Sequence, residues 1–294
     1  MNATLKGYLQ LCRPPNLPTA AADIIAGSAL AGIFVEDGII PIDALLLLVL
    51  ASVLLYAGGV VLNDVFDASL DAVERPERPI PSGVIPKKKA AFFGIVLLLS
   101  GIVCAILVNH TSGTVAVGLA LSILSYDAFS KNNALLGPLN MGVCRGLNLL
   151  LGISIVGAFV QLEYLIVPIV FIAAITTVSR GEVHGNNKKN LVLAGFLYAL
   201  VLFFVMYFHT NHMKPFLPYL VFLALFAAMV LAPLVKAYQK NTPENIKKAV
   251  ISGVLGIVIL DAAIAVAYSN WMIGILILLL LPLSKLLAKL FAVT

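Results

Sequence analysis

The chain has 294 residues, of which 61% are apolar and only 11% are charged, against roughly 25% charged residues in an ordinary soluble domain. So few charges cannot cover a surface that faces water, and the mean hydropathy of +1.04 agrees. These values exclude a disordered chain, a fibrous or disulfide-stapled protein and a soluble globular domain. We expect an integral membrane protein, an all-α polytopic helix bundle whose residues 1–294 form a single transmembrane domain.

Apolar runs separated by polar residues predict nine membrane spans. A helix needs about 20 apolar residues to cross the hydrocarbon. The predicted spans, in chain order, are 15–35, 42–64, 90–108, 114–130, 136–159, 163–180, 191–208, 217–235 and 249–268. A tenth candidate, 271–291, carries Lys285 and Lys289, whose long side chains can reach a membrane face, so it either spans the membrane or lies along its surface. No convincing linker or internal repeat is visible, and the oligomeric state is not decided by the sequence.

The net charge of +5 is explained by membrane orientation and needs no nucleic acid. If the N-terminus is cytoplasmic, every Lys and Arg residue except Lys214 and Arg145 lies on the cytoplasmic side. A bias of this kind sets the orientation of a membrane protein. We therefore expect the active site in the two polar cytoplasmic loops, 63–89 and 180–190. It would lie on the cytoplasmic side of the membrane, which is the plasma membrane if the protein is bacterial.

Three aspartates and an asparagine lie at the cytoplasmic end of the second predicted span and just beyond it. The residues that share about a quarter of the circumference of a helix, at 100° per residue, are Asn63, Asp64, Asp67 and Asp71. Three carboxylates so close repel one another unless a cation lies among them. Magnesium typically uses one or two carboxylates and completes its shell with water and phosphate oxygens. The alternative, a solvated helix end, fits less well because acids at the membrane boundary are costly to bury.

We call Asn63, Asp64, Asp67 and Asp71 the aspartate stripe. A proline-rich segment, Glu74–Gly83, comes directly after it and contains Arg75 and Arg78. The prolines stop the helix and stiffen the loop. Guanidinium groups bind phosphate oxygens bidentately, so the two arginines predict a diphosphate site beside the aspartates. The alternative is that they only follow the positive-inside rule.

Residues 63–83 resemble, position for position, the first aspartate-rich signature of the UbiA superfamily of intramembrane prenyltransferases, N-D-x-x-D-x-x-x-D followed by R-P-x-R-P-x-x-S-G. The span count and the basic cytoplasmic loops are similar to that superfamily over most of the chain. The resemblance implies a UbiA-like bundle of nine or ten helices that opens laterally to lipid. It also implies a prenyl diphosphate bound through Mg²⁺, with transfer of the prenyl group to an aromatic or lipid-like acceptor.

The superfamily's second acidic motif follows the sixth span, and the corresponding stretch here is Ser179–Asn187. Aligning Glu182, His184 and Asn186 with the three acidic positions leaves one carboxylate. The resemblance then implies Glu182 and Asn186 as ligands of a weakened metal site, leaves a second Mg²⁺ open, and implies Arg180 or His184 as direct contacts to diphosphate. The alternative for His184 is a solvated loop residue. The residue pattern of this stretch, S-R-G-E-V-H-G, is also similar to that of the EboC-type proteins of the superfamily.

Four further residues complete the predicted substrate site: Asn16, Tyr126, Lys131 and Arg145. Asn16 ends a segment, Arg13–Asn16, that resembles the superfamily's entry segment, and Tyr126 with Lys131 resembles its tyrosine and lysine near the diphosphate. Arg145 lies in an apolar span, where an arginine costs at least ~2.5 kcal/mol and must face a partner or a cavity. It either meets the diphosphate or one of the motif aspartates, or it forms a structural ion pair. The possible partners for that pair are Asp23, Asp127 and Asp261.

The predicted reaction is a magnesium-dependent prenyl transfer with Asp64 and Asp67 as catalytic residues. Bound cations neutralise the charge that accumulates on the leaving diphosphate, and apolar walls keep water from the allylic cation. Two alternatives remain: a secondary transporter, which would place charges near the midplane and show repeat symmetry, and a UbiA-like protein that binds prenyl lipids with little catalysis. The acceptor and the prenyl length are not decided by the sequence.

Overall fold

The structure, a computed structural model, describes residues 2–34, 40–180, 185, 188–209 and 216–291. Every regular element in these ranges is helical. The first half contains α1 (Ala3–Leu11), η1 (Pro14–Asn16), α2 (Leu17–Leu30), α3 (Ile42–Phe66), α4 (Ala68–Glu74), α5 (Lys87–Val108), α6 (His110–Ser125), η2 (Tyr126–Ser130) and α7 (Leu136–Ile153). The second half contains η3 (Ser154–Val156), η4 (Leu162–Leu165), α8 (Ile166–Ser179), α9 (Lys188–His209), α10 (Phe216–Gln239), α11 (Pro243–Tyr268), α12 (Trp271–Leu278) and α13 (Leu280–Leu290).

Nine helical segments in the described part of the chain are long and apolar enough to cross a membrane. The expectation of an all-α, multi-pass membrane protein is therefore confirmed. The tenth candidate is one of the nine, because α12 and α13 together make a 20-residue segment, Trp271–Leu290. The first expected span is shorter than predicted, since α2 has 14 residues whereas a full crossing takes about 20.

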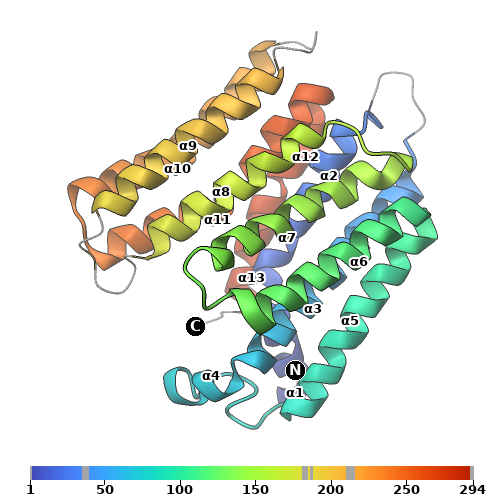
Figure 1. The fold of residues 1–294 in the computed structure, drawn as a ribbon, viewed down its shortest axis with the longest axis vertical. Coiled ribbons are helices and arrows are strands. Elements are labelled where there is room, and N and C mark those ends of the chain that lie inside the picture. Colours follow the sequence, from blue (N-terminus) through green and yellow to red (C-terminus); the bar gives the residue numbers. More distant parts are fainter. Residues whose placement is uncertain (1, 35–39, 181–184, 186–187, 210–215, 292–294) are drawn as a thin grey trace.

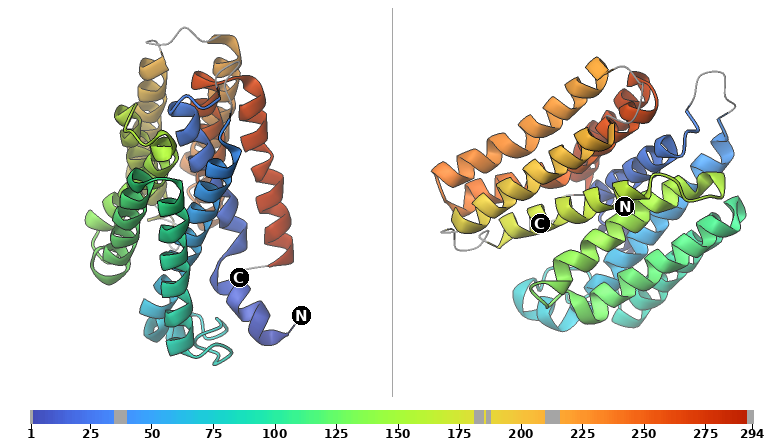
Figure 2. Two further views of the ribbon diagram at one scale, coloured as in Figure 1. Left: turned by 90° about the vertical axis from the view of Figure 1, so that its right-hand side faces the viewer. Right: turned by 45° about the horizontal axis from the view of Figure 1, so that its top comes forward.

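The helices form one bundle in which α2, α7 and α11 are central (Figure 1). Helices α5 and α6 lie on one side of it and α9 and α10 on the other. Helix α1 and the last turn of α13 lie toward the same end of the bundle as α4, as Figure 2 also shows. The N-terminal helix α1 and the start of α5 also lie at this end of the bundle.

The close crossing of α2 and α7 depends on glycine. A Cβ atom built on Gly152 would lie 2.9 Å from the Cα of Ile24 and 3.0 Å from the Cα of Gly27, so the two backbones touch without room for a side chain. Ser28 adds a hydrogen bond from its Oγ to the carbonyl of Gly152, at 3.3 Å. Small residues allow this kind of close approach between helices in lipid.

We expect Gly152→Ala to destabilise the bundle by about 1–3 kcal/mol, because the added methyl group overpacks a backbone contact. Thermal unfolding in detergent micelles measures the change. The matched control is Gly118→Ala in α6, where a Cβ would meet nothing within 4 Å, and which should leave stability unchanged. An equal loss in both variants would contradict the role of the α2–α7 contact.

A second, smaller apolar cluster lies at the α4 end of the bundle. It joins α1, the end of α3, the proline-rich loop and the start of α5. Its buried members are Leu11, Val61, Ile80, Ile85 and Ala90. This cluster holds the loop and α1 against the end of α3, where the aspartates lie.

Candidate active site

The aspartate stripe lies at the junction of α3 and α4. Helix α3 ends at Phe66 and α4 begins at Ala68, but the helical hydrogen bonds continue across the junction. The amide of Asp67 donates to the carbonyl of Asn63 at 2.9 Å, and that of Asp71 donates to the carbonyl of Asp67 at 2.8 Å. The stripe residues therefore keep helical spacing. The prolines end α4 at Glu74, as predicted.

Arg78 returns from the loop and joins two of the aspartates. Its Nη1 lies 2.8 Å from Oδ2 of Asp71 and 3.3 Å from Oδ1 of Asp64. Both carboxylates are buried. Arg75 lies further out, with Nη1 at 3.7 Å from Oδ1 of Asp71 and half of its side chain exposed. The loop thus folds back over the helix end and places one guanidinium between two carboxylates.

Arg13 is a partner of the stripe that sequence reasoning missed. Its Nη2 lies 2.5 Å from Oδ1 of Asp64. Its backbone is left-handed, with φ 48° and ψ 62°, a conformation that costs of order 1–3 kcal/mol in a residue other than glycine. The strained turn between α1 and η1 directs Arg13 toward Asp64. The sequence signal for this region was the resemblance of Arg13–Asn16 to the superfamily's entry segment, which did not assign a role to Arg13.

Lys131, which follows η2, contacts Asp67, the remaining aspartate of the stripe. Its Nζ lies 2.5 Å from Oδ1 of Asp67 and 5.7 Å from the ring centroid of Phe66. Helix η2 is a π-helical turn, in which the amide of Lys131 donates to the carbonyl of Tyr126 at 3.0 Å. Such turns interrupt α-helices, frequently at functional sites. This turn brings Lys131 over the stripe.

The same turn places Asp127 against Asn63. The side-chain amide of Asn63 donates to Oδ1 of Asp127 at 2.8 Å, and Asp127 is 3% exposed. This hydrogen bond fixes the orientation of the Asn63 amide, so that its oxygen is left for another partner. Sequence reasoning considered Asp127 only as an alternative partner of Arg145.

The donors at the stripe fit a hard divalent cation shared with a phosphate. Carboxylate and amide oxygens are the ligands that Mg²⁺ accepts. Across the residues that the structure describes, no three acidic, histidine or cysteine side chains converge closely enough to enclose a metal ion by themselves. Magnesium can use one or two protein carboxylates when water and phosphate oxygens complete its shell. The stripe therefore fits an ion held jointly by protein and ligand better than a closed protein cage.

Arg145 does not reach the stripe. Its Nε lies 2.8 Å from Oδ2 of Asp23, and its Nη2 lies 3.8 Å from Oδ2 of Asp261. Its Nη2 also donates to the carbonyl of Thr19 at 2.5 Å. Asn148 donates to Asp23 at 2.7 Å. Of the two alternatives raised by the sequence, the structure shows the ion pair inside the bundle.

The remaining predicted residues are placed less centrally. Arg180 donates from Nη2 to the carbonyl of Ala134 at 2.5 Å. Asn16 precedes α2, and its carbonyl accepts a hydrogen bond from the hydroxyl of Thr19 at 2.8 Å. Tyr126 begins η2 and is partly buried. The positions that carry the second acidic motif, Glu182, His184 and Asn186, lie outside the described residues.

Cys12 is the thiol nearest to this site in sequence, next to Arg13. Burial raises the pKa of Cys12 to about 11. A thiol with so high a pKa stays protonated at neutral pH and is a poor nucleophile. Covalent catalysis by this cysteine is therefore disfavoured.

Comparison with known proteins agrees with this geometry. Residues 25–254 match the UbiA prenyltransferase family. The digeranylgeranylglyceryl phosphate synthase of Methanosarcina barkeri is 32% identical over 165 residues, which are 53% of this chain and 57% of that protein. The chain thus spans little more than half the length of the curated relatives it matches.

Solved structures share the fold. One described as a digeranylgeranylglyceryl phosphate synthase in membranes has a TM-score of 0.70 at 24% identity, covering 91% of this chain and 99% of that chain. A UbiA homolog from Archaeoglobus fulgidus, bound to GPP and Mg²⁺, has a TM-score of 0.60 at 17% identity, covering 88% of this chain and 99% of that one. The narrower resemblance to the EboC-type branch stays a prediction. The family match over most of the chain, together with the shared fold, shows that this protein belongs to the UbiA prenyltransferase family.

Proposed function

We propose that this chain, as a single transmembrane domain, transfers a prenyl group from an isoprenoid diphosphate to an acceptor within the membrane, in a magnesium-dependent reaction. The observation that carries the proposal is the alternation of acidic and basic groups at one end of α3. Asp64, Asp67 and Asp71 each contact a basic side chain. The structures of a UbiA homolog from Archaeoglobus fulgidus are described as bound to GPP and Mg²⁺ or to DMAPP and Mg²⁺, which supports the same ligand class here.

The basic groups would bind the diphosphate. Arg13 and Lys131 keep 27% and 13% of their side chains exposed, so each can exchange a carboxylate partner for a phosphate oxygen. Arg78 holds Asp64 and Asp71 in place from the loop. Magnesium held at the stripe by Asp64 and Asp67, with Asn63 and Asp71 beside them, would neutralise charge on the leaving group.

Bond breaking at the allylic carbon sends the electron pair to the diphosphate oxygen. The acceptor then forms the new bond to that carbon and loses a proton. Donors arranged in advance around the diphosphate stabilise the charge that develops in this step. The apolar helices around the site keep water away from the allylic cation.

The acceptor is proposed as a lipid-like or aromatic molecule, and a glyceryl phosphate lipid is the first to test. The relatives that this chain matches over half their length are named digeranylgeranylglyceryl phosphate synthase. We further propose that the stripe faces the cytoplasm, because Lys87, Lys88, Lys89 and Lys131 lie at this end and the positive-inside rule places basic residues there.

A turnover assay tests the proposed function. The purified chain is reconstituted in vesicles with labelled prenyl diphosphates of different lengths, with and without a geranylgeranylglyceryl phosphate acceptor, with Mg²⁺ or with a chelator. We expect release of diphosphate and a prenylated product by mass spectrometry, both abolished by the chelator. Binding of prenyl diphosphate without release would instead support the lipid-binding alternative, and passage of solute across the vesicle without product would support the transporter.

A further inference from the structure

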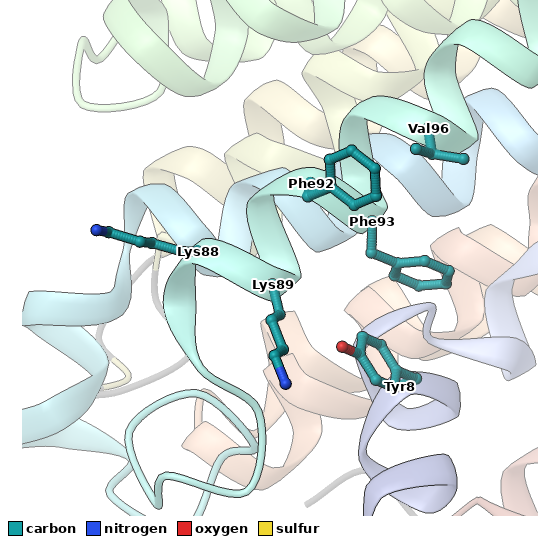
Figure 3. Close-up of a pocket in the computed structure, with 6 residues that line it drawn as sticks. All are labelled: Tyr8, Lys88, Lys89, Phe92, Phe93 and Val96. Atoms are coloured by element: carbon teal, nitrogen blue, oxygen red, sulfur yellow. The ribbon is translucent and has the colours of Figure 1, made fainter.

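A groove separate from the aspartate stripe lies between α1 and the start of α5. It has a volume of about 420 Å³ and is lined by Tyr8, Lys88, Lys89, Phe92, Phe93 and Val96 (Figure 3). The ring of Tyr8 meets that of Phe93 edge-on, with centroids 5.0 Å apart, and this contact closes the inner side. The groove therefore has a built inner wall between two helices.

The outer wall of the groove is apolar and open to the surroundings. Phe92 is 71% exposed and Val96 is 40% exposed, and both lie on α5, one of the helices that can cross a membrane. In a bilayer these side chains would contact hydrocarbon. This wall suits an alkyl chain that runs along α5.

The rim of the groove is basic. In Figure 3 the side chain of Lys89 extends toward the ring and hydroxyl of Tyr8, whereas Lys88 points away from them. Neither lysine has an ion pair with any residue that the structure describes. An ammonium group and a hydroxyl group can both donate to a phosphate oxygen. The rim thus complements an anionic headgroup, and it adjoins the apolar wall that suits the alkyl chain of the same lipid.

We propose that this groove binds an anionic phospholipid, with its phosphate between Lys89 and Tyr8 and an acyl chain against Phe92 and Val96. Basic pockets between membrane helices commonly select such headgroups. The bound lipid would hold α1 against α5. Because α1 leads directly into Arg13, which contacts Asp64, the lipid would also steady that contact, but its binding does not depend on the proposed prenyl transfer.

Native mass spectrometry of the full chain tests the proposal, with phosphatidylglycerol and phosphatidylcholine of equal chain length as probes. Phosphatidylglycerol should be retained about fivefold better than phosphatidylcholine, because the attraction between one lysine and an anionic headgroup gives a preference of this size. Lys89→Gln should abolish this preference, and Tyr8→Phe should reduce it with the ring kept. Lys89→Arg should preserve it.

The matched control is Lys247→Gln, which removes one exposed lysine from α11, far from the groove in sequence. It should leave the preference unchanged. Equal retention of the two lipids, or an equal loss in Lys247→Gln and Lys89→Gln, would overturn the proposal. Displacement of the lipid by millimolar inorganic phosphate would also overturn the proposal. Such displacement would show a site for free anions, to which the acyl chain of the lipid contributes nothing.

Discussion

Replacing Asp64 with asparagine is expected to lower the rate of prenyl diphosphate consumption by about 100-fold or more, the scale seen when one preorganised charge-stabilising group is removed. Asp64 is buried and meets both Arg13 and Arg78. Its loss would remove a carboxylate that we propose to bind magnesium and would release two guanidinium groups from their positions. The turnover assay in vesicles, with Mg²⁺ varied, measures the effect.

The matched control for this variant is Asp43→Asn. Asp43 lies in the first turn of the same helix, α3, and is exposed at the end opposite the stripe. It should retain full activity. Unchanged activity in Asp64→Asn would contradict the assignment of the stripe, and so would an equal loss in the control. A thermal unfolding curve for each variant separates a chemical effect from loss of fold.

Local features of this site could be predicted from the sequence because they depend on nearby residues. Helical spacing alone brings Asp64, Asp67 and Asp71 to one side, and the hydrogen bonds across the α3–α4 junction keep that spacing. Proline chemistry predicts the end of α4. The apolar runs predict the crossing helices, because the hydrocarbon thickness sets their length.

The contacts between distant segments could not be predicted in the same way. Arg13 and Asp64 are 51 residues apart, and Asn63 and Asp127 are 64 apart. Whether such residues meet depends on which faces of neighbouring helices pack together, and periodicity does not report that. The π-helical turn of η2 adds to the difficulty, since one extra residue in the turn rotates everything after it.

Arg145 illustrates the same limit. The cost of an arginine in hydrocarbon showed that it needs a partner, but three aspartates were possible. The structure selects Asp23 and Asp261 because α2 packs against both α7 and α11 at the centre of the bundle. The tight α2–α7 crossing is what brings Asp23 within reach of Arg145.

Replacing Arg145 with methionine is expected to destabilise the bundle by about 3–5 kcal/mol, the usual cost of removing one partner from a buried ion pair. Asp23 and Asp261 are 2% and 5% exposed, so no water would replace the lost guanidinium. Methionine keeps most of the side-chain volume, which separates the loss of charge from the loss of packing. Chemical denaturation in mixed micelles measures the difference.

The informative comparison for that variant is Asp261→Asn. Two carboxyl groups face one guanidinium in this cluster, and Oδ2 of Asp261 has no hydrogen-bond donor among the described residues. An amide of the same shape removes the surplus acid and leaves the Arg145–Asp23 pair intact, so stability should change by less than about 1 kcal/mol, within the range of shape-conserving replacements. If Asp261→Asn cost as much as Arg145→Met, the cluster would instead be a three-part unit that needs both carboxylates, and the surplus-acid interpretation would be wrong.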